Sequence, residues 1–136
     1  MSNDTLHRFL LDDLDISGAV VRLGPAWRLM LDNRGYAAAV AQLLGEMTAT
    51  TLLLAGNLKQ PGRLTIQLRG SGALSLLVMD CNEQLQIRGM AKCTAAIEAG
   101  AASELLGDGQ LQLALDMASM REPYQSIVPL AGDSIA

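Results

Sequence analysis

Between positions 36 and 58, hydrophobic residues recur at intervals of three and four, which is the spacing of one face of an α-helix. The face comprises Val40, Leu43, Leu44, Met47, Thr51, Leu54 and Leu58. Leu52 and Leu53 widen it until little of the helix surface is left for water. The pattern predicts a long central helix on which the rest of the chain packs.

The same stretch is nearly long enough to cross a bilayer, so a membrane span is the alternative. It carries Glu46 near its middle, where a charge costs roughly 2.5 to 3.5 kcal/mol. Gln42 and three threonines make it more polar still. We interpret it as the buried helix of a soluble protein and expect no membrane partner.

A strand and a short helix are predicted ahead of the long helix. Residues 15–23 have the apolar, β-branched character of a first strand. Gly24-Pro25 begins a short helix that Gly35 ends, since proline is favoured at the first helical position and glycine after the last.

After Pro61-Gly62 the period of the apolar residues changes from about four to two, which indicates strands. The inward side chains are predicted to be Leu64, Ile66 and Leu68 on one strand and Leu74, Leu76 and Val78 on the next. Gly70-Ser71-Gly72 is then a three-residue hairpin loop. This loop places position 68 opposite 74, 66 opposite 76 and 64 opposite 78, so every inward residue meets another.

Three more strands complete the pattern. Residues 84–92 alternate with Leu85 and Ile87 inward, after a turn of two or four residues near Asn82-Glu83. Residues 110–117 follow a short helical turn around 104–106, and 123–130 has prolines at both ends, which suits an edge strand. The chain is therefore predicted to be one α+β domain, residues 1–136, with mostly antiparallel sheets packed against a long central helix and shorter helices.

The last residues contain a helix start. Asp and Ser are favoured N-caps, and Gly132-Asp133-Ser134 supplies both two residues before the sequence stops. We expect the chain to be truncated at the point where a further helix begins.

Composition narrows the class of function. Half of the residues are hydrophobic and 18% are charged, which is typical of a compact domain. The net charge of -4, the pI near 4.8 and an aromatic share of 3% lack the basic, ring-bearing surface of a nucleic-acid binder. The N-terminal residues carry acids and no basic segment ahead of an apolar one, so a cytoplasmic location is expected.

The glycine pairs do not indicate phosphate binding, and no nucleophile is predicted. Gly70-Ser71-Gly72 leads into a strand and lacks a third glycine, as does Gly107-Asp108-Gly109. Ser71 is not flanked as in a nucleophile elbow, because Arg69 fills one of the glycine places. The single histidine, His7, has no third group to make a triad and is interpreted as an exposed polar residue. No catalytic residue is predicted, and an enzyme is the least supported class.

Metal and disulfide chemistry are not expected either. Asp12, Asp13 and Asp15 are interpreted as a solvated acidic turn, with a hard-cation site as the alternative. Cys81 and Cys93 form no CxxC pair, so a four-ligand zinc site within the chain is excluded unless it is shared. They lie roughly 30 Å apart if the intervening strand is extended at ~3.3 Å per residue. Two reduced thiols, one of them inward, are predicted.

What remains is a surface on the outer face of the hairpins. Ala73, Leu77, Met79 and Met90 are predicted to interrupt its polar row and to form an adaptable apolar patch that contacts another protein. The alternative is that a helix of the missing portion covers these residues.

The order of residues resembles a known family. The carrying segments are LHRFL (6–10), LLGEMTATTLLLAGNLKQPGRLTIQLRGSGALSLLVMD (43–80), IRGMAK (87–92) and YQSIVPLAG (124–132). In this order, over essentially the whole chain, they are similar to the N-terminal core of the heat shock protein 33 family. Departures are Ala73, where proline is common, and Ser126, where glycine is common.

The resemblance implies an ATP-independent cytoplasmic holdase chaperone that binds unfolding client proteins under oxidative stress and forms a homodimer. In that family, zinc is bound by four cysteines of a C-terminal redox-switch module that this chain lacks. Cys81 and Cys93 do not match its motif, so no cofactor is expected here. A self-association module without client binding is the alternative function.

Overall fold

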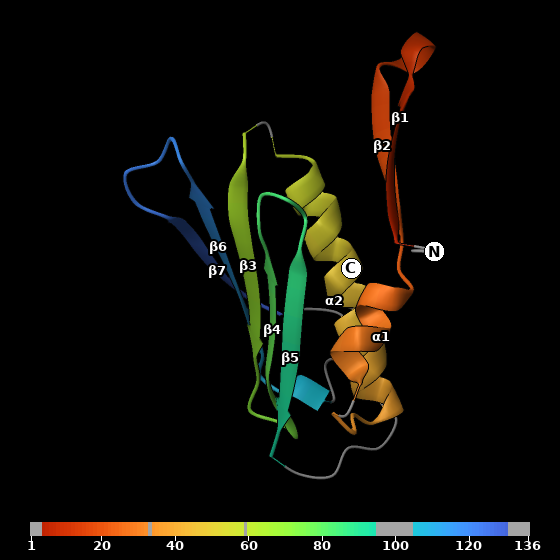
Figure 1. Cartoon of the computed structure of the whole chain (residues 1–136). Helices are drawn as coiled ribbons and strands as arrows, with labels where there is room; N and C mark the ends of the chain where they lie inside the picture. The colour runs from red at the N-terminus through yellow and green to blue at the C-terminus, as the bar shows by residue number, and fades with distance from the viewer. Residues whose placement is uncertain (1–3, 33, 59, 95–104, 131–136) are drawn as a thin grey trace.

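The computed structural model describes residues 4–32, 34–58, 60–94 and 105–130 (Figure 1). In chain order the elements are β1 (Thr5–Leu11), the 3-10 turn η1 (Asp12–Leu14), β2 (Ile16–Arg22), α1 (Pro25–Leu31), α2 (Ala38–Gly56), β3 (Gly62–Arg69), β4 (Leu74–Cys81), β5 (Ile87–Cys93), β6 (Gln110–Met117) and β7 (Tyr124–Pro129).

Five of the strands form one antiparallel sheet in the order β5-β4-β3-β6-β7. Helix α2 lies against β3, β4 and β5, and α1 packs beside α2 and β5 (Figure 1). Strands β1 and β2 form a separate hairpin, which we call the arm, that contacts α2 at its base and projects past it. The predicted α+β fold with a long helix against an antiparallel sheet is confirmed.

The core lies between α2 and the sheet. Val40, Leu44 and Met47 of α2 are fully buried against it. The helix is long and apolar enough to cross a membrane, but these contacts make it the core helix that the sequence predicts. Two threonines of α2 are buried, and both of their hydroxyls have hydrogen-bond partners. Thr48 Oγ1 donates to the carbonyl of Leu44 at 2.6 Å, and Thr51 Oγ1 donates to that of Met47 at 2.7 Å.

The β3–β4 hairpin forms as predicted, but its register differs by three residues. Leu68 lies opposite Leu77, and Ile66 opposite Met79, instead of the predicted Leu74 and Leu76. An odd shift turns the side chains of β4 that pair with β3, residues 76–81, to the other face, whereas Leu74 before them is buried in the core as predicted. Leu77 and Met79 are therefore inward, whereas Leu76 and Val78, predicted inward, lie on the outer face and are half-buried.

The loop of this hairpin explains the shift. Between the last pair, Arg69 and Leu76, lie residues 70–75, three more than predicted, and Gly72 N–H donates to the carbonyl of Leu106 at 3.0 Å. A Cβ on Gly70 would lie 2.8 Å from the Cα of Leu106, so glycine is needed for the loop to dock there. The register thus depends on a contact with a distant segment.

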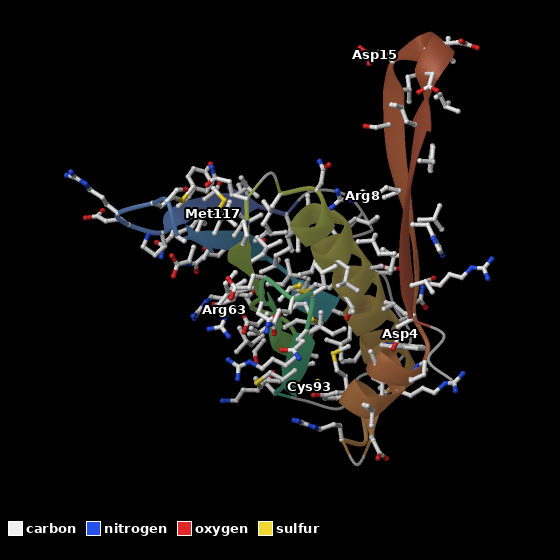
Figure 2. All side chains as sticks on the ribbon, turned by 45° about the horizontal axis from the view of Figure 1, so that its top comes forward. Asp4, Arg8, Asp15, Arg63, Cys93 and Met117 are labelled. Carbon is white, nitrogen blue, oxygen red and sulfur yellow. The ribbon has the colours of Figure 1, made fainter. Side chains whose placement is uncertain are left out.

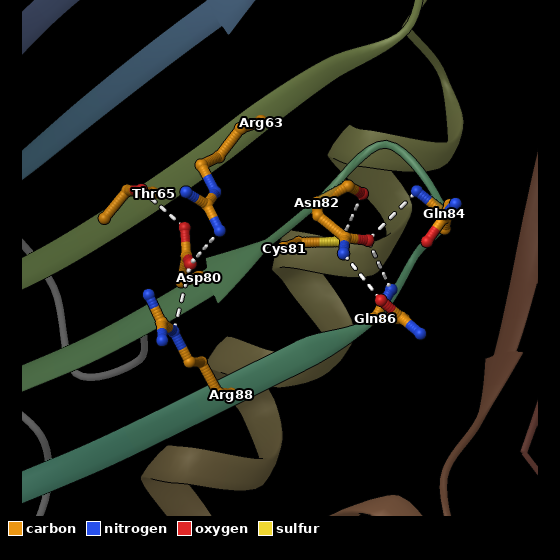
Figure 3. A network of polar contacts seen from close by, with 8 residues as sticks. All are labelled: Arg63, Thr65, Asp80, Cys81, Asn82, Gln84, Gln86 and Arg88. Carbon is orange, nitrogen blue, oxygen red and sulfur yellow. Dashed lines mark hydrogen bonds and ion pairs between the residues drawn. The ribbon is translucent and has the colours of Figure 1, made fainter.

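The other two hairpins differ from the prediction in part. The strand predicted at 15–23 forms as β2, but it is the second strand of the arm, and its partner β1 was not expected. Strand β5 begins at Ile87, because Asn82 Oδ1 accepts the N–H groups of Gln84 and Gln86 and builds a five-residue loop (Figure 3). Leu85 sits in that loop with a φ of 60° and is exposed, not inward.

The last two strands lie where the alternation predicts them. β6 spans Gln110–Met117, and β7 is the sheet's edge, with prolines next to it and at its end. Leu105 and Leu106 are helical, as expected. Glu104 and the predicted helix start at Asp133 lie outside the described residues.

Candidate functional site

The patch predicted from the sequence is not a surface. Leu77 and Met79 are 0% exposed, and Met79 Sδ lies 3.8 Å from Thr48 Oγ1 of α2. Met90 is 38% exposed opposite Val78 on the outer face, and Ala73 is half-buried in the β3–β4 loop. The structure therefore separates the four residues into core, sheet face and loop, because the predicted register put β4 the wrong way round.

The outer face of the sheet is held instead by a polar cluster around Asp80 (Figure 3). Thr65 Oγ1 donates to Asp80 Oδ1 at 2.8 Å, and Arg63 and Arg88 form ion pairs with Oδ2 at 3.4 and 3.2 Å. These residues come from β3, β4 and β5, so the cluster ties three neighbouring strands together. All of its described charges are engaged with one another, as in a structural cluster.

The two cysteines lie at opposite ends of the β4–β5 pair, since Cys81 is opposite Ile87 and Cys93 is opposite Leu74. Both are free, and one thiol faces inward as predicted; the buried one is Cys81, and Cys93 is exposed. Burial, with a smaller contribution from the neighbouring Asp80 carboxylate, raises the pKa of Cys81 to about 11. Its thiol is therefore protonated and unreactive at neutral pH.

Titratable side chains do not gather into a reactive site in the part of the chain that the structure describes. No three His, Cys, Asp or Glu residues among them are placed to share a metal ion. His7 is exposed on β1, and the aspartates 12, 13 and 15 lie in the exposed turn at the tip of the arm. The acidic turn is therefore exposed, as predicted.

The arm exposes apolar side chains on the face turned away from α2. This face, which we call the arm stripe, consists of Phe9, Leu11, Ile16 and Val20. Each of the four is between 46% and 50% exposed, and Leu10 and Leu14 near the tip are more exposed still. Clustered exposure of this kind marks interaction surfaces, whereas scattered exposed apolar residues need no explanation.

The base of the arm is fastened to the body (Figure 2, where Asp4 marks the base and Asp15 the tip). Leu6 packs on α2, where a Cβ on Gly56 would come within 2.5 Å of its Cδ2. Asp4 caps α1, because its carboxylate oxygens accept the N–H groups of Gly24 at 2.8 Å and Ala26 at 3.0 Å. An isolated two-stranded hairpin is marginal in water, so these contacts hold the stripe in its exposed position.

A second apolar group lies on the edge strand β7. Tyr124 and Val128 are about half exposed on the helix side, and Ile127 is 60% exposed on the other. The outer edge of β7 has no neighbouring strand among the described residues. Exposed apolar edges are sites at which sheets pair with other chains.

Sequence reasoning missed the arm stripe although part of the signal is present. Phe9, Leu10 and Leu11 form a short apolar run, which is compatible with a strand but does not alternate with polar residues. No glycine or proline marks the turn at Asp12–Leu14, and both strands lack the buried face that usually reveals a strand.

Comparison with known proteins gives one family. The family model described as Hsp33 protein matches residues 4–136. The chain is 40% identical over 135 residues to the 33 kDa chaperonin of Chromobacterium violaceum and 43% identical over 136 residues to that of Pseudomonas paraeruginosa. Each match covers 98% of this chain and 46% of the relative. The chain thus spans about half the length of these relatives.

A solved structure has the same fold. The crystal structure of the 33 kDa chaperonin (heat shock protein 33 homolog) of Thermotoga maritima superimposes with a TM-score of 0.81 at 19% sequence identity. The similarity covers 96% of this chain and 47% of that one.

Proposed function

The chain belongs to the Hsp33 family, and from this premise we propose that it is the client-binding core of an ATP-independent holdase chaperone. The proposed clients are proteins that unfold under oxidative stress in the cytoplasm. The relatives carry the name of a chaperonin and not of an enzyme, which agrees with the lack of a catalytic constellation in the sequence.

The observation that carries the proposal is the arm stripe. Unfolding proteins expose apolar segments, and a holdase must offer them apolar area that its own fold does not bury. Phe9, Leu11, Ile16 and Val20 do so on one continuous face that projects beyond the body. Their mixture of aromatic and branched shapes has no polar group that would select one client sequence.

Light scattering of a heat-denatured test enzyme measures the activity. The chain is expected to suppress aggregation in the absence of ATP. Replacing the facing pair Leu11 and Ile16 by serine removes the tip end of the stripe without touching the core, and should raise the amount of chain needed roughly fivefold.

The matched control is Leu29→Ser, which removes an equally apolar and 74% exposed side chain from α1. It should suppress aggregation like the parent chain. Equal loss in both variants would indicate general surface hydrophobicity, and no loss in the double variant would remove the arm stripe from the client surface. Thermal unfolding of each variant shows whether the core is intact.

Self-association is the second candidate, and we propose that it uses β7. Its edge lies next to Tyr124, Ile127 and Val128, which supports strand pairing between two copies in a homodimer. Sedimentation that shows a monomer over a wide concentration range would count against it. Ile127→Lys, which charges the edge, should shift a dimer toward monomer.

We also propose that this chain holds no zinc by itself. The four-cysteine site of the family needs thiolates that converge on one ion, whereas Cys81 and Cys93 are separated by the length of the β4–β5 pair. Redox control would then reside in the portion of the longer relatives that this chain does not span. Metal analysis of the purified chain after dialysis against zinc is expected to find no stoichiometric ion.

A further inference from the structure

A pocket of about 490 Å³ lies where the base of the arm meets α1, α2 and the start of β5. We call it the basal pocket. Its volume falls in the range of small-molecule sites, about 300 to 1,000 Å³. It is distinct from the arm stripe, because none of the four residues of the stripe lines it.

The inner wall of the basal pocket is apolar. Met30 of α1 and Leu52 of α2 line it and are buried members of the core, and Leu23 and Ile87 pack beside them. An apolar wall of this kind accommodates a short hydrocarbon body and gives it affinity by removing it from water.

Three arginines surround this wall. Arg22 ends β2, Arg34 follows α1, and Arg88 lies on β5. Arg88 is paired with Asp80, but Arg22 and Arg34 make no ion pair with any residue that the structure describes. The one carboxylate in the lining, Asp4, accepts hydrogen bonds from two backbone N–H groups. A chain with a net charge of -4 thus concentrates positive charge at this place.

Thr5 supplies a further polar group to the pocket. Its Oγ1 is buried and has no hydrogen-bond partner, and it is the sole such side-chain atom in the described part of the chain. Thr5 lies directly opposite Arg22 in the β1–β2 pair, so the two side chains share one face of the arm. Buried hydroxyls are nearly always paired, and one that is left without a partner in a pocket calls for an explanation.

We propose that the basal pocket binds an amphipathic carboxylate, a small molecule with one anionic head and a short apolar body. Arg22 and Arg34 hold the head, the Thr5 hydroxyl donates to one of its oxygens, and the body lies against Leu52 and Ile87. Guanidinium groups suit a carboxylate because they donate paired, charge-assisted hydrogen bonds. This inference does not depend on client binding.

Such a ligand would connect the arm to the body. Thr5 and Arg22 belong to the arm, whereas Leu52 and Ile87 belong to α2 and β5. Binding is therefore expected to slow the exchange of β1 and β2 amide protons, since a ligand that requires both parts disfavours their separation.

Octanoate is the probe, titrated into the 136-residue chain and followed by NMR amide shifts and hydrogen exchange. Saturable binding is expected, with shifts at Thr5, Arg22 and Ile87 and slower exchange in the arm. Octylammonium has the same body with a cationic head, and acetate has the head without the body. Both should bind at least about tenfold more weakly. Equal binding of octylammonium, or no saturation by octanoate, would overturn the proposal.

Arginine variants test whether octanoate binding depends on the basal pocket or only on the overall charge of the chain. Arg22→Gln and Arg34→Gln should each weaken octanoate binding about five- to tenfold. Arg121→Gln changes the same charge at an exposed position in the β6–β7 connection and should leave binding unchanged. Two arginine positions are tested because one variant alone could disturb the arm. Unchanged affinity in both pocket variants, or an equal loss in Arg121→Gln, would contradict the assignment.

Discussion

The ring of Phe9 lies over the backbone of Gly18, its direct partner across the β1–β2 pair. A Cβ on Gly18 would overlap the ring, so this position admits the contact because it is glycine. The ring shields a strand position that has no side chain of its own, an arrangement that stabilises glycines in sheets.

This contact predicts a spectroscopic signature and a stability effect. The α-protons of Gly18 should be shifted upfield by the ring, and the shift should vanish in Phe9→Leu. Phe9→Ala should destabilise the arm by about 1 kcal/mol, because cross-strand contacts contribute 0.2 to 1 kcal/mol and the hairpin is marginal. Hydrogen exchange should then rise in β1 and β2 and stay unchanged in β3. Uniformly faster exchange would show that the arm is not a separate unit.

The corrected register predicts opposite outcomes for two residues of the patch expected from the sequence. Leu77→Ala should lower the free energy of unfolding by about 2 to 5 kcal/mol, since it opens a cavity against α2. Met90→Ala, on the outer face, should cost less than about 1 kcal/mol. Urea unfolding measures both. Similar small losses would favour the register in which Leu77 faces outward.

The two thiols are predicted to differ in reactivity. Iodoacetamide at pH 8 should modify Cys93 and leave Cys81 intact until the chain unfolds, because Cys81 is buried and its pKa is raised to about 11. Mass spectrometry after proteolysis identifies the labelled site. Rapid labelling of Cys81 under native conditions would mean that β4 opens locally.

The same thiol links stability to alkaline pH. The folded chain holds the Cys81 proton more tightly than the unfolded chain, whose thiol has the ordinary pKa of 9.0. Its contribution is therefore fully present below pH 9 and is lost as the pH rises toward about 11. Cys81→Ala should flatten the fall in stability over this window, whereas Cys93→Ala should not.

Replacing each of two threonines by valine is expected to change the free energy of unfolding in opposite directions. Thr5→Val removes a buried hydroxyl without a partner and should raise the free energy of unfolding by up to about 1 kcal/mol. Thr65→Val removes the donor to Asp80 and should lower it by about 1 kcal/mol. Thermal unfolding of the pair gives the comparison. A loss of stability in Thr5→Val would mean that its hydroxyl has a partner.

Strong periodicity made part of this fold readable from the sequence. Helix α2 and strand β6 form where the spacing of apolar residues places them. The register of β3 and β4 could not be predicted from the sequence. In Leu74–Met79, apolar residues stand at both odd and even positions, so the alternation of apolar and polar residues does not show which face of β4 is buried. What chooses it is the docking of Gly70 and Gly72 on Leu105 and Leu106, a contact between distant segments.

The candidate surface was mislocated for a related reason. The predicted patch included Leu77 and Met79 because the predicted register placed them on the outer face of β4, whereas both are buried. The arm stripe escaped notice because a strand that buries neither face leaves no burial pattern, and only pairing with β2 makes Phe9 and Leu11 part of one surface. The basal pocket forms only where the arm, α1, α2 and β5 meet, which no local sequence pattern indicates.

The strand order of the sheet has a consequence for synthesis. β3, β4 and β5 can pair as soon as they leave the ribosome, but β6 pairs with β3, which joins residues as distant in sequence as Gly62 and Met117. Until β6 emerges, one edge of β3 in the nascent chain stays open to solvent, and late, non-local pairing of this kind is slow and prone to aggregation. A chain proposed to protect unfolding proteins from aggregation is therefore itself prone to aggregation during part of its synthesis.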